Sequence, residues 1–316
     1  MRRIFLNGGF GLVLLAVSMF SVRHFMKGGW PLHHADPWLL TAAALLYGIA
    51  YAFKAWGWQR LFADEERPGA GSLAFAGGAA CAAGIALPGR LDDAVRIACV
   101  RRFPGTRAGF GTIGLSLVVL GMLDNAALTP LASVAAADAD KWTVRLGFAV
   151  VAGAGVLAAA VVATLPKLAS TRAVLRFRLG RWLNTRGHCN KRNLACLGLI
   201  SISWALRGTA VFLLLDALSM HGTFPLALAF LCASAASAAL PIAPAGAATQ
   251  AGAGAAILIA NGVHTTQAIA FGVAAQALVV VTGAAVMLLV AAWQLALRLR
   301  LGGQRGARHE VAPAYQ

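Results

Sequence analysis

The sequence has little charge for its length. Only 12% of its 316 residues are Asp, Glu, Lys or Arg, whereas 59% are hydrophobic. A soluble domain carries charge at about a quarter of its positions, so this composition excludes an ordinary soluble enzyme. The mean hydropathy of +0.72 and several apolar runs of about 18 residues or more instead indicate helices that cross a membrane.

Acidic residues are the scarcer charged class, with 11 Asp and Glu against 27 Lys and Arg, for a net charge of +16. In a soluble protein this excess would suggest nucleic-acid binding. Here the basic residues lie between the apolar runs, and no basic patch interleaved with aromatic residues accompanies them. We therefore expect no nucleic-acid partner, and we assign the basic residues to cytoplasmic loops that face anionic membrane lipids.

Cysteine pairs and catalytic motifs are also missing. The five cysteines are scattered without a CxxC pair, which argues against a disulfide framework or a zinc site. The sequence contains no P-loop, no GxSxG and no HExxH. The acidic pair Asp92-Asp93 resembles half of a magnesium site, but it has no second acidic cluster and is flanked by arginines. We expect no catalytic residue, no metal and no cofactor.

Six apolar stretches are long enough to cross a bilayer, and two further stretches are not continuous. The six lie at about 4–23, 37–58, 108–131, 143–165, 194–218 and 267–296. Stretches 71–88 and 224–262 are interrupted by proline and glycine. If 71–88 crossed fully, the five arginines from Arg90 to Arg107 would lie outside, against the positive-inside rule. We therefore predict two re-entrant hairpins, near 71–105 and 224–262, with ordinary kinked helices as the alternative.

The resulting fold prediction is an all-α polytopic membrane protein with about six full spans, two re-entrant hairpins and an inverted repeat. Residues 1–142 form the first repeat and 143–300 the second, and 301–316 form a disordered cytoplasmic tail. Each half crosses the membrane an odd number of times, so the halves are inverted. Both termini are expected on the cytoplasmic side of a bacterial inner membrane. Paired interrupted segments point to a transport site near the bilayer midplane.

The first hairpin carries the densest polar cluster, Arg90, Asp92, Asp93 and Arg96. Asp92 and Arg96 have the i,i+4 spacing of a helical salt bridge, and the two acids suit the first turn of a helix. One interpretation is an interfacial helix with its own salt bridges. The other is that Arg90 and Arg96 bind a lipid phosphate, whose oxygens match the guanidinium fork.

The second hairpin is broken by Pro241 and Pro244, which cannot both sit undisturbed in one helix, and its polar side chains include Gln250. Charged residues also occur inside the predicted spans, where a charge normally faces the bundle interior and has a partner. Arg207 is the leading candidate, with Asp124 as its potential partner across the bundle. We expect Lys54 to extend toward an interface and Asp216 to lie at the outer boundary.

Two motifs carry a family resemblance that spans essentially the whole chain. Leu87-Pro88-Gly89-Arg90-Leu91, with Asp93 and Arg96, resembles the first motif of the lysylphosphatidylglycerol synthase transmembrane-region family, which is also called flippase-like. Leu240-Pro241 through Gly246, with Asn261-Gly262-Val263, resembles the second motif. The chain departs from the family pattern at Asp92, Ala245 and Ala248, where glycine is usual, and at Gln250, where glutamate is usual. The last span lacks a frequently seen arginine, and its nearest polar residue is Gln276.

The resemblance implies flipping of phospholipids or other lipid-linked molecules between leaflets. The aminoacyl-transferase domain of some members is missing, so lysyl transfer is not implied. We expect a lipid translocase, not an enzyme, that moves an anionic phospholipid or a polyprenyl-phosphate-linked lipid. Its partners would be the lipid substrate and anionic membrane lipids, and the sequence leaves a homo-oligomer open. The alternatives are a membrane-embedded enzyme that acts on lipid headgroups and a non-transporting scaffold for envelope lipid synthesis.

Overall fold

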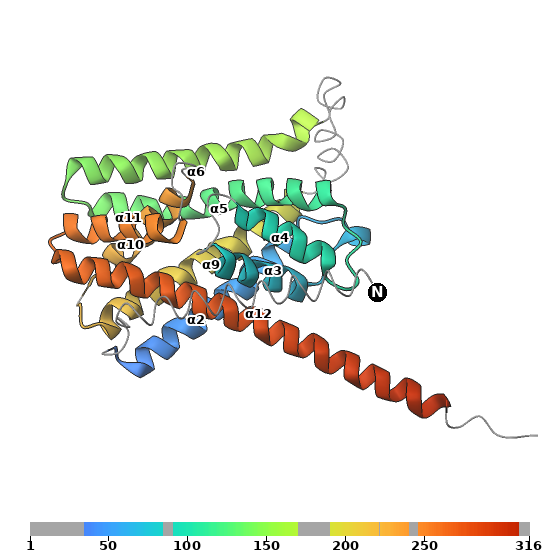
Figure 1. Ribbon diagram of the computed structural model, residues 1–316. Helices are drawn as coiled ribbons and strands as arrows, with labels where there is room; N and C mark the ends of the chain where they lie inside the picture. Colours follow the sequence, from blue (N-terminus) through green and yellow to red (C-terminus); the bar gives the residue numbers. More distant parts are fainter. Residues whose placement is uncertain (1–34, 85–90, 170–189, 221, 240–245, 310–316) are drawn as a thin grey trace, which may run out of the picture.

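The computed structural model describes residues 35–84, 91–169, 190–220, 222–239 and 246–309. Within these ranges the regular elements are helices (Figure 1). They are α2 (Pro37–Gln59), the 3-10 helix η1 (Asp64–Glu66), α3 (Ala70–Ala83), α4 (Leu91–Arg102), α5 (Phe110–Asp138), α6 (Trp142–Ala169), α9 (Asn190–Ala217), α10 (Phe224–Ala239), α11 (Gly246–Ala260) and α12 (Thr265–His309).

Five of the helices in the described ranges, namely α2, α5, α6, α9 and α12, are long and apolar enough to cross a membrane. Even α2, with 23 residues, extends about 35 Å at 1.5 Å per residue, more than the bilayer core of about 30 Å. This confirms the predicted all-α polytopic membrane fold and five of its six spans. The first predicted span, 4–23, lies outside the described residues.

The predicted tail needs a correction, because α12 continues to His309. The expectation of a disordered segment from 301 to 316 is therefore wrong for 301–309, and 310–316 lie outside the described residues. No proline interrupts 301–309, so the helix continues past the apolar segment although Gly302, Gly303 and Gly306 have low helix propensity. Figure 1 shows α12 running past the other helices at this end.

The helices alternate in direction and define two ends of the bundle. At one end the amide of Asp36, before α2, donates to the carbonyl of Ala217, at the end of α9 (2.9 Å). At the other end Asp64, after α2, pairs with Arg192, near the start of α9 (2.8 Å). We call these the Asp138 end and the Arg192 end, because α5 finishes at the first and α9 begins at the second.

Exposed tryptophans mark both ends. Trp38 (83% exposed) and Trp142 (71%) lie at the Asp138 end, and Trp56 (47%) and Trp293 (64%) lie toward the Arg192 end. Trp38 and Trp56 are 18 residues apart on α2, or about 27 Å, close to the thickness of the hydrocarbon core. Tryptophan is enriched where the hydrocarbon meets the headgroups, so these rings indicate where the bilayer surfaces fall.

The two interrupted stretches form two helix pairs, α3–α4 and α10–α11. The chain enters and leaves the first pair at one end of the bundle and the second pair at the other end. Phe75, early in α3, contacts Phe103, just after α4, with ring centroids 5.7 Å apart at the Arg192 end. The chain enters α10 and leaves α11 at the Asp138 end, around Thr223 and Asn261. The longest of the four helices, with 16 residues, extends only about 24 Å, so none spans the bilayer core. Two short helices in each stretch fit the predicted re-entrant hairpins and not single kinked helices. The connecting residues 85–90 and 240–245 lie outside the described ranges.

The contacts between helices have an approximate two-fold pattern. Exchanging α2 with α9, α3 with α10, α4 with α11, and α5 with α12 turns each contact among these eight helices into another contact that is present. Thus α3 packs on α12 as α10 packs on α5, and α2 packs on α12 as α9 packs on α5. Helix α6 has no counterpart in this exchange. This pattern supports an inverted repeat, whose division between residues 142 and 143 remains a prediction.

Candidate functional site

The centre of the bundle contains an ion pair between two spanning helices. Lys54 of α2 donates to a carboxylate oxygen of Asp124 on α5 at 2.7 Å, and these side chains are 23% and 18% exposed. The indole N–H of Trp204, on α9, donates to the other oxygen of Asp124 at 3.0 Å. Both carboxylate oxygens therefore have a donor, as a charge within a membrane helix requires. Three helices meet at this carboxylate.

This pairing corrects two expectations. Asp124 is the partner of Lys54 and not of Arg207, and the Lys54 ammonium is held by this carboxylate inside the bundle. The reason lies on α9, where Trp204 stands one turn before Arg207 and takes the hydrogen bond to Asp124. The guanidinium of Arg207 lies over the Trp204 ring instead, 4.9 Å from its centroid, and 5.7 Å from that of Tyr51.

Arg207 is the cation without an acid in this cluster. Its Nε is buried without a hydrogen-bond partner, and across the described ranges no carboxylate forms a salt bridge with it. Contact with two aromatic faces offsets part of the cost of burial, but it leaves the Nε–H donor unsatisfied. The position predicted as the leading candidate thus has capacity to bind an anion.

Arg96 of α4 pairs with both acidic residues of its own helix. Arg96 bonds to Asp93 at 2.6 Å and to Asp92 at 3.1 Å, which confirms the predicted i,i+4 salt bridge. Helix α4 packs on α5, which carries Asp124, so α4 borders the central cluster. Arg90, the other arginine predicted to bind phosphate, lies outside the described residues.

The second hairpin contributes a neutral polar contact beside the charged cluster. The side-chain amide of Gln276 on α12 faces Gln250 of α11 at 3.5 Å, and the hydroxyl of Ser234 donates to the Gln250 carbonyl at 2.9 Å. Three residues past Gln276, about 4.5 Å along the helix, the Val279 carbonyl accepts from the Tyr51 hydroxyl at 3.4 Å. The two polar clusters therefore adjoin along α12. Pro241 and Pro244 lie outside the described ranges.

Sequence reasoning missed the aromatic members of the site, Tyr51 and Trp204. A signal for each is present in the sequence. Tyr51 and Lys54 are three residues apart in one apolar helix, as are Trp204 and Arg207 in another, so each aromatic ring shares a face with a charge. Within the described part of the chain, no group of three or more His, Cys, Asp or Glu residues is arranged to hold a metal ion.

One comparison with known proteins gave a match. The family described as "Lysylphosphatidylglycerol synthase TM region" matches residues 4–300, nearly the whole chain. Searches of curated proteins and of solved structures found no match. The family match agrees with the resemblance carried by the two hairpin motifs, and it indicates a membrane function related to lipids.

Proposed function

We propose that this protein is a lipid translocase. The premise is that the chain belongs to the lysylphosphatidylglycerol synthase transmembrane-region family. In this proposal it carries an anionic phospholipid or a polyprenyl-phosphate-linked lipid between leaflets and catalyses no chemical reaction. The Arg192 end faces the cytoplasm of a bacterial inner membrane, because arginines gather there. These include Arg60, Arg67, Arg101, Arg102 and Arg107.

The observation that carries the proposal is the half-buried Arg207 at the centre of the bundle, whose Nε is buried without a hydrogen-bond partner and which has no acidic partner among the described residues. A phosphate that reached this position would gain a charge-assisted hydrogen bond from the otherwise unsatisfied Nε–H. The hairpins approach the centre from opposite ends, which suits a site reached in turn from each leaflet. Lys54 and Arg96 are already neutralised by acids, so Arg207 supplies the uncompensated charge.

Leaflet exchange in proteoliposomes tests this function. Purified protein is reconstituted with fluorescent phosphatidylglycerol, and dithionite quenching from outside measures how fast the inner-leaflet probe becomes accessible. We expect exchange well above that of protein-free vesicles. Replacing Arg207 with Gln should slow exchange about tenfold or more, because a hydrogen bond to a charged group contributes about 1.5–3 kcal/mol.

Arg192→Gln is the matched control, since it removes the same charge at the end of the bundle. It should leave exchange near the wild-type rate. If wild-type exchange of both phosphatidylglycerol and a fluorescent polyprenyl phosphate equals that of protein-free vesicles, the proposed function is refuted. If Arg207→Gln and Arg192→Gln slow exchange equally, the assignment of the site to Arg207 is wrong.

A further inference from the structure

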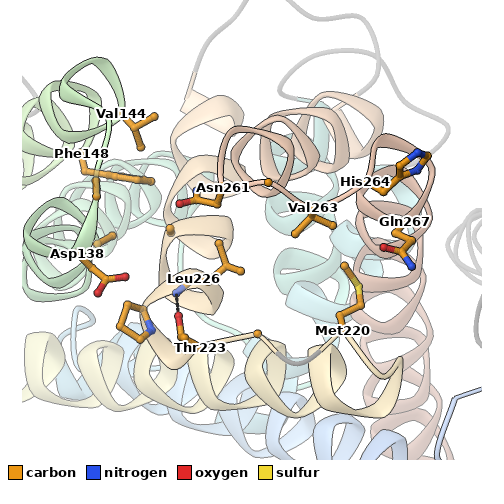
Figure 2. Close-up of a pocket in the computed structure, with 16 residues that line it drawn as sticks. Asp138, Val144, Phe148, Met220, Thr223, Leu226, Asn261, Val263, His264 and Gln267 are labelled. Carbon is orange, nitrogen blue, oxygen red and sulfur yellow. Dashed lines mark hydrogen bonds between the residues drawn. The ribbon is translucent and has the colours of Figure 1, made fainter.

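A second site lies away from the charged cluster, at the Asp138 end. It is a cavity of about 550 Å³ bounded by the end of α5, the start of α6 and the loops on either side of the second hairpin (Figure 2). This volume is in the range of small-ligand pockets. In Figure 2, Asp138 and Phe148 line one side of it, His264 and Gln267 the opposite side, and Asn261 lies between them.

The polar groups of this cavity differ from those of the central cluster. None of the described residues that line it is Lys or Arg, and Asp138 is its one carboxylate. The nearby Lys141 and Arg145 are exposed and do not line it. A phosphate would therefore meet a carboxylate without a cation, which is unfavourable. The cavity does not repeat the anion-binding chemistry of Arg207.

The remaining polar side chains match hydroxyl groups. Asn261 donates one hydrogen bond to the Ile257 carbonyl, Thr223 accepts one from the Leu226 amide, and His264 shares one with Thr266. Each of the three keeps a further donor or acceptor for a ligand, Gln267 offers both, and Asp138 accepts. An ammonium group only donates, so it could not accept a hydrogen bond from the amide N–H groups. Hydroxyls both donate and accept. Phe148 adds an apolar side chain to the lining of the cavity.

We propose that this cavity binds a polyhydroxylated group, a sugar or a glycerol, and that its occupant is the headgroup of the transported lipid. The identification of the occupant rests on the proposed function, whereas the preference for hydroxyl groups rests on the cavity alone. The transported lipid would then carry both a phosphate, which Arg207 binds in the centre, and a polyol, which the cavity binds at the Asp138 end.

Equilibrium binding of tritiated octyl β-glucoside to the purified protein tests the proposal. A scintillation proximity assay measures binding in a polyoxyethylene detergent, because a maltoside would itself present sugar hydroxyls. We expect saturable binding that Asp138→Ala weakens about tenfold or more, since a carboxylate makes charge-assisted hydrogen bonds to hydroxyls. Asp140→Ala removes the same charge two residues away, outside the cavity, and should leave the affinity unchanged.

A second variant, Gln267→Ala, changes a lining side chain on another helix, and it should also weaken binding. Thermal unfolding of each variant shows that it is folded. If unlabelled glucose displaces the tritiated ligand as strongly as unlabelled octyl glucoside does, the preference for hydroxyl groups is supported and the site is assigned to a free sugar. If only unlabelled octyl glucoside displaces it, a lipid headgroup is supported. The proposal is overturned if octyl glucoside does not bind, if Asp140→Ala weakens it as much as Asp138→Ala, or if octylamine binds in its place.

The binding assay and the exchange assay fail separately. If octyl glucoside binding depends on Asp138 and neither phosphate lipid exchanges between leaflets, the translocase function is refuted and the polyol site is supported. If leaflet exchange depends on Arg207 but octyl glucoside does not bind, the translocase function is supported and the polyol site is refuted.

Discussion

The pair formed by Lys54 and Asp124 allows a quantitative test of the central site. Replacing Asp124 with Ala leaves Lys54 without its counter-charge and Trp204 without its acceptor. Removing one partner of a fully buried pair destabilises soluble proteins by about 3–5 kcal/mol. Because these side chains retain 23% and 18% exposure, we expect a smaller loss, about 2–3 kcal/mol.

A double-mutant cycle separates the pair from its surroundings. Lys54→Met and Asp124→Ala are measured singly and together, and the difference from additivity is their coupling energy. Polar contacts between membrane helices couple by about 0.6 kcal/mol on average and about 1.7 kcal/mol at most. A charged pair at 2.7 Å should lie in the upper part of this range, so we expect about 1–2 kcal/mol. The double variant should therefore be more stable than the sum of the single losses implies.

Unfolding by sodium dodecyl sulfate in mixed micelles, followed by tryptophan fluorescence, provides the free energies. The chain has eight tryptophans to report the transition. A parallel cycle with Arg207→Met is the control, because Arg207 contacts the Trp204 ring and not the Asp124 carboxylate. Its coupling to Asp124 should be smaller than that of Lys54, because the two residues meet only through the Trp204 ring. A larger coupling to Arg207 than to Lys54 would refute the pairing.

Two further predictions concern packing and pH. Gly78→Ala should destabilise the protein by about 1–3 kcal/mol in the same unfolding assay, because the added Cβ would collide with the backbone of Gly283 on α12. The control is Gly77→Ala, whose added Cβ meets only ordinary van der Waals contacts and should have little effect. Similar losses for the two variants would contradict the backbone contact. The hydrogen bond from Arg192 holds the pKa of Asp64 below its ordinary value, so the stability advantage of the wild type over Asp64→Asn should be full above the unfolded pKa and disappear as pH falls through the folded pKa. An advantage that grows on acidification would contradict this link.

Much of the fold follows from the sequence because membrane spans obey local rules. An apolar run of sufficient length predicts a span by itself. The arginines from Arg90 to Arg107 predict that the first interrupted stretch returns to the cytoplasmic side. The extension of α12 was missed for a related reason. The sequence rule detects where hydropathy falls, whereas a helix stops only where a residue breaks it or its caps are satisfied.

The site was harder to predict, because spacing along a helix shows which residues share a face and not which helix that face meets. Arg207 and Asp124 were both identified as buried charges, but the indole of Trp204 lies between them and sets the actual pairing. The cavity at the Asp138 end was not predicted at all. Asp138, Thr223, Asn261 and His264 come from distant loops and helix ends, and no sequence motif links them.

Both hairpins pack against α12, and the same helix also contacts the central cluster. α12 meets the first hairpin at Gly283, against Gly78, and the second at Gly272, against the carbonyl of Ala251. Both are close contacts between backbones, which leave no room for an added Cβ atom. Between them α12 carries Gln276 and the Val279 carbonyl, which contact the second hairpin and Tyr51. Helix α12 therefore contacts both hairpins and, through Tyr51, the central cluster.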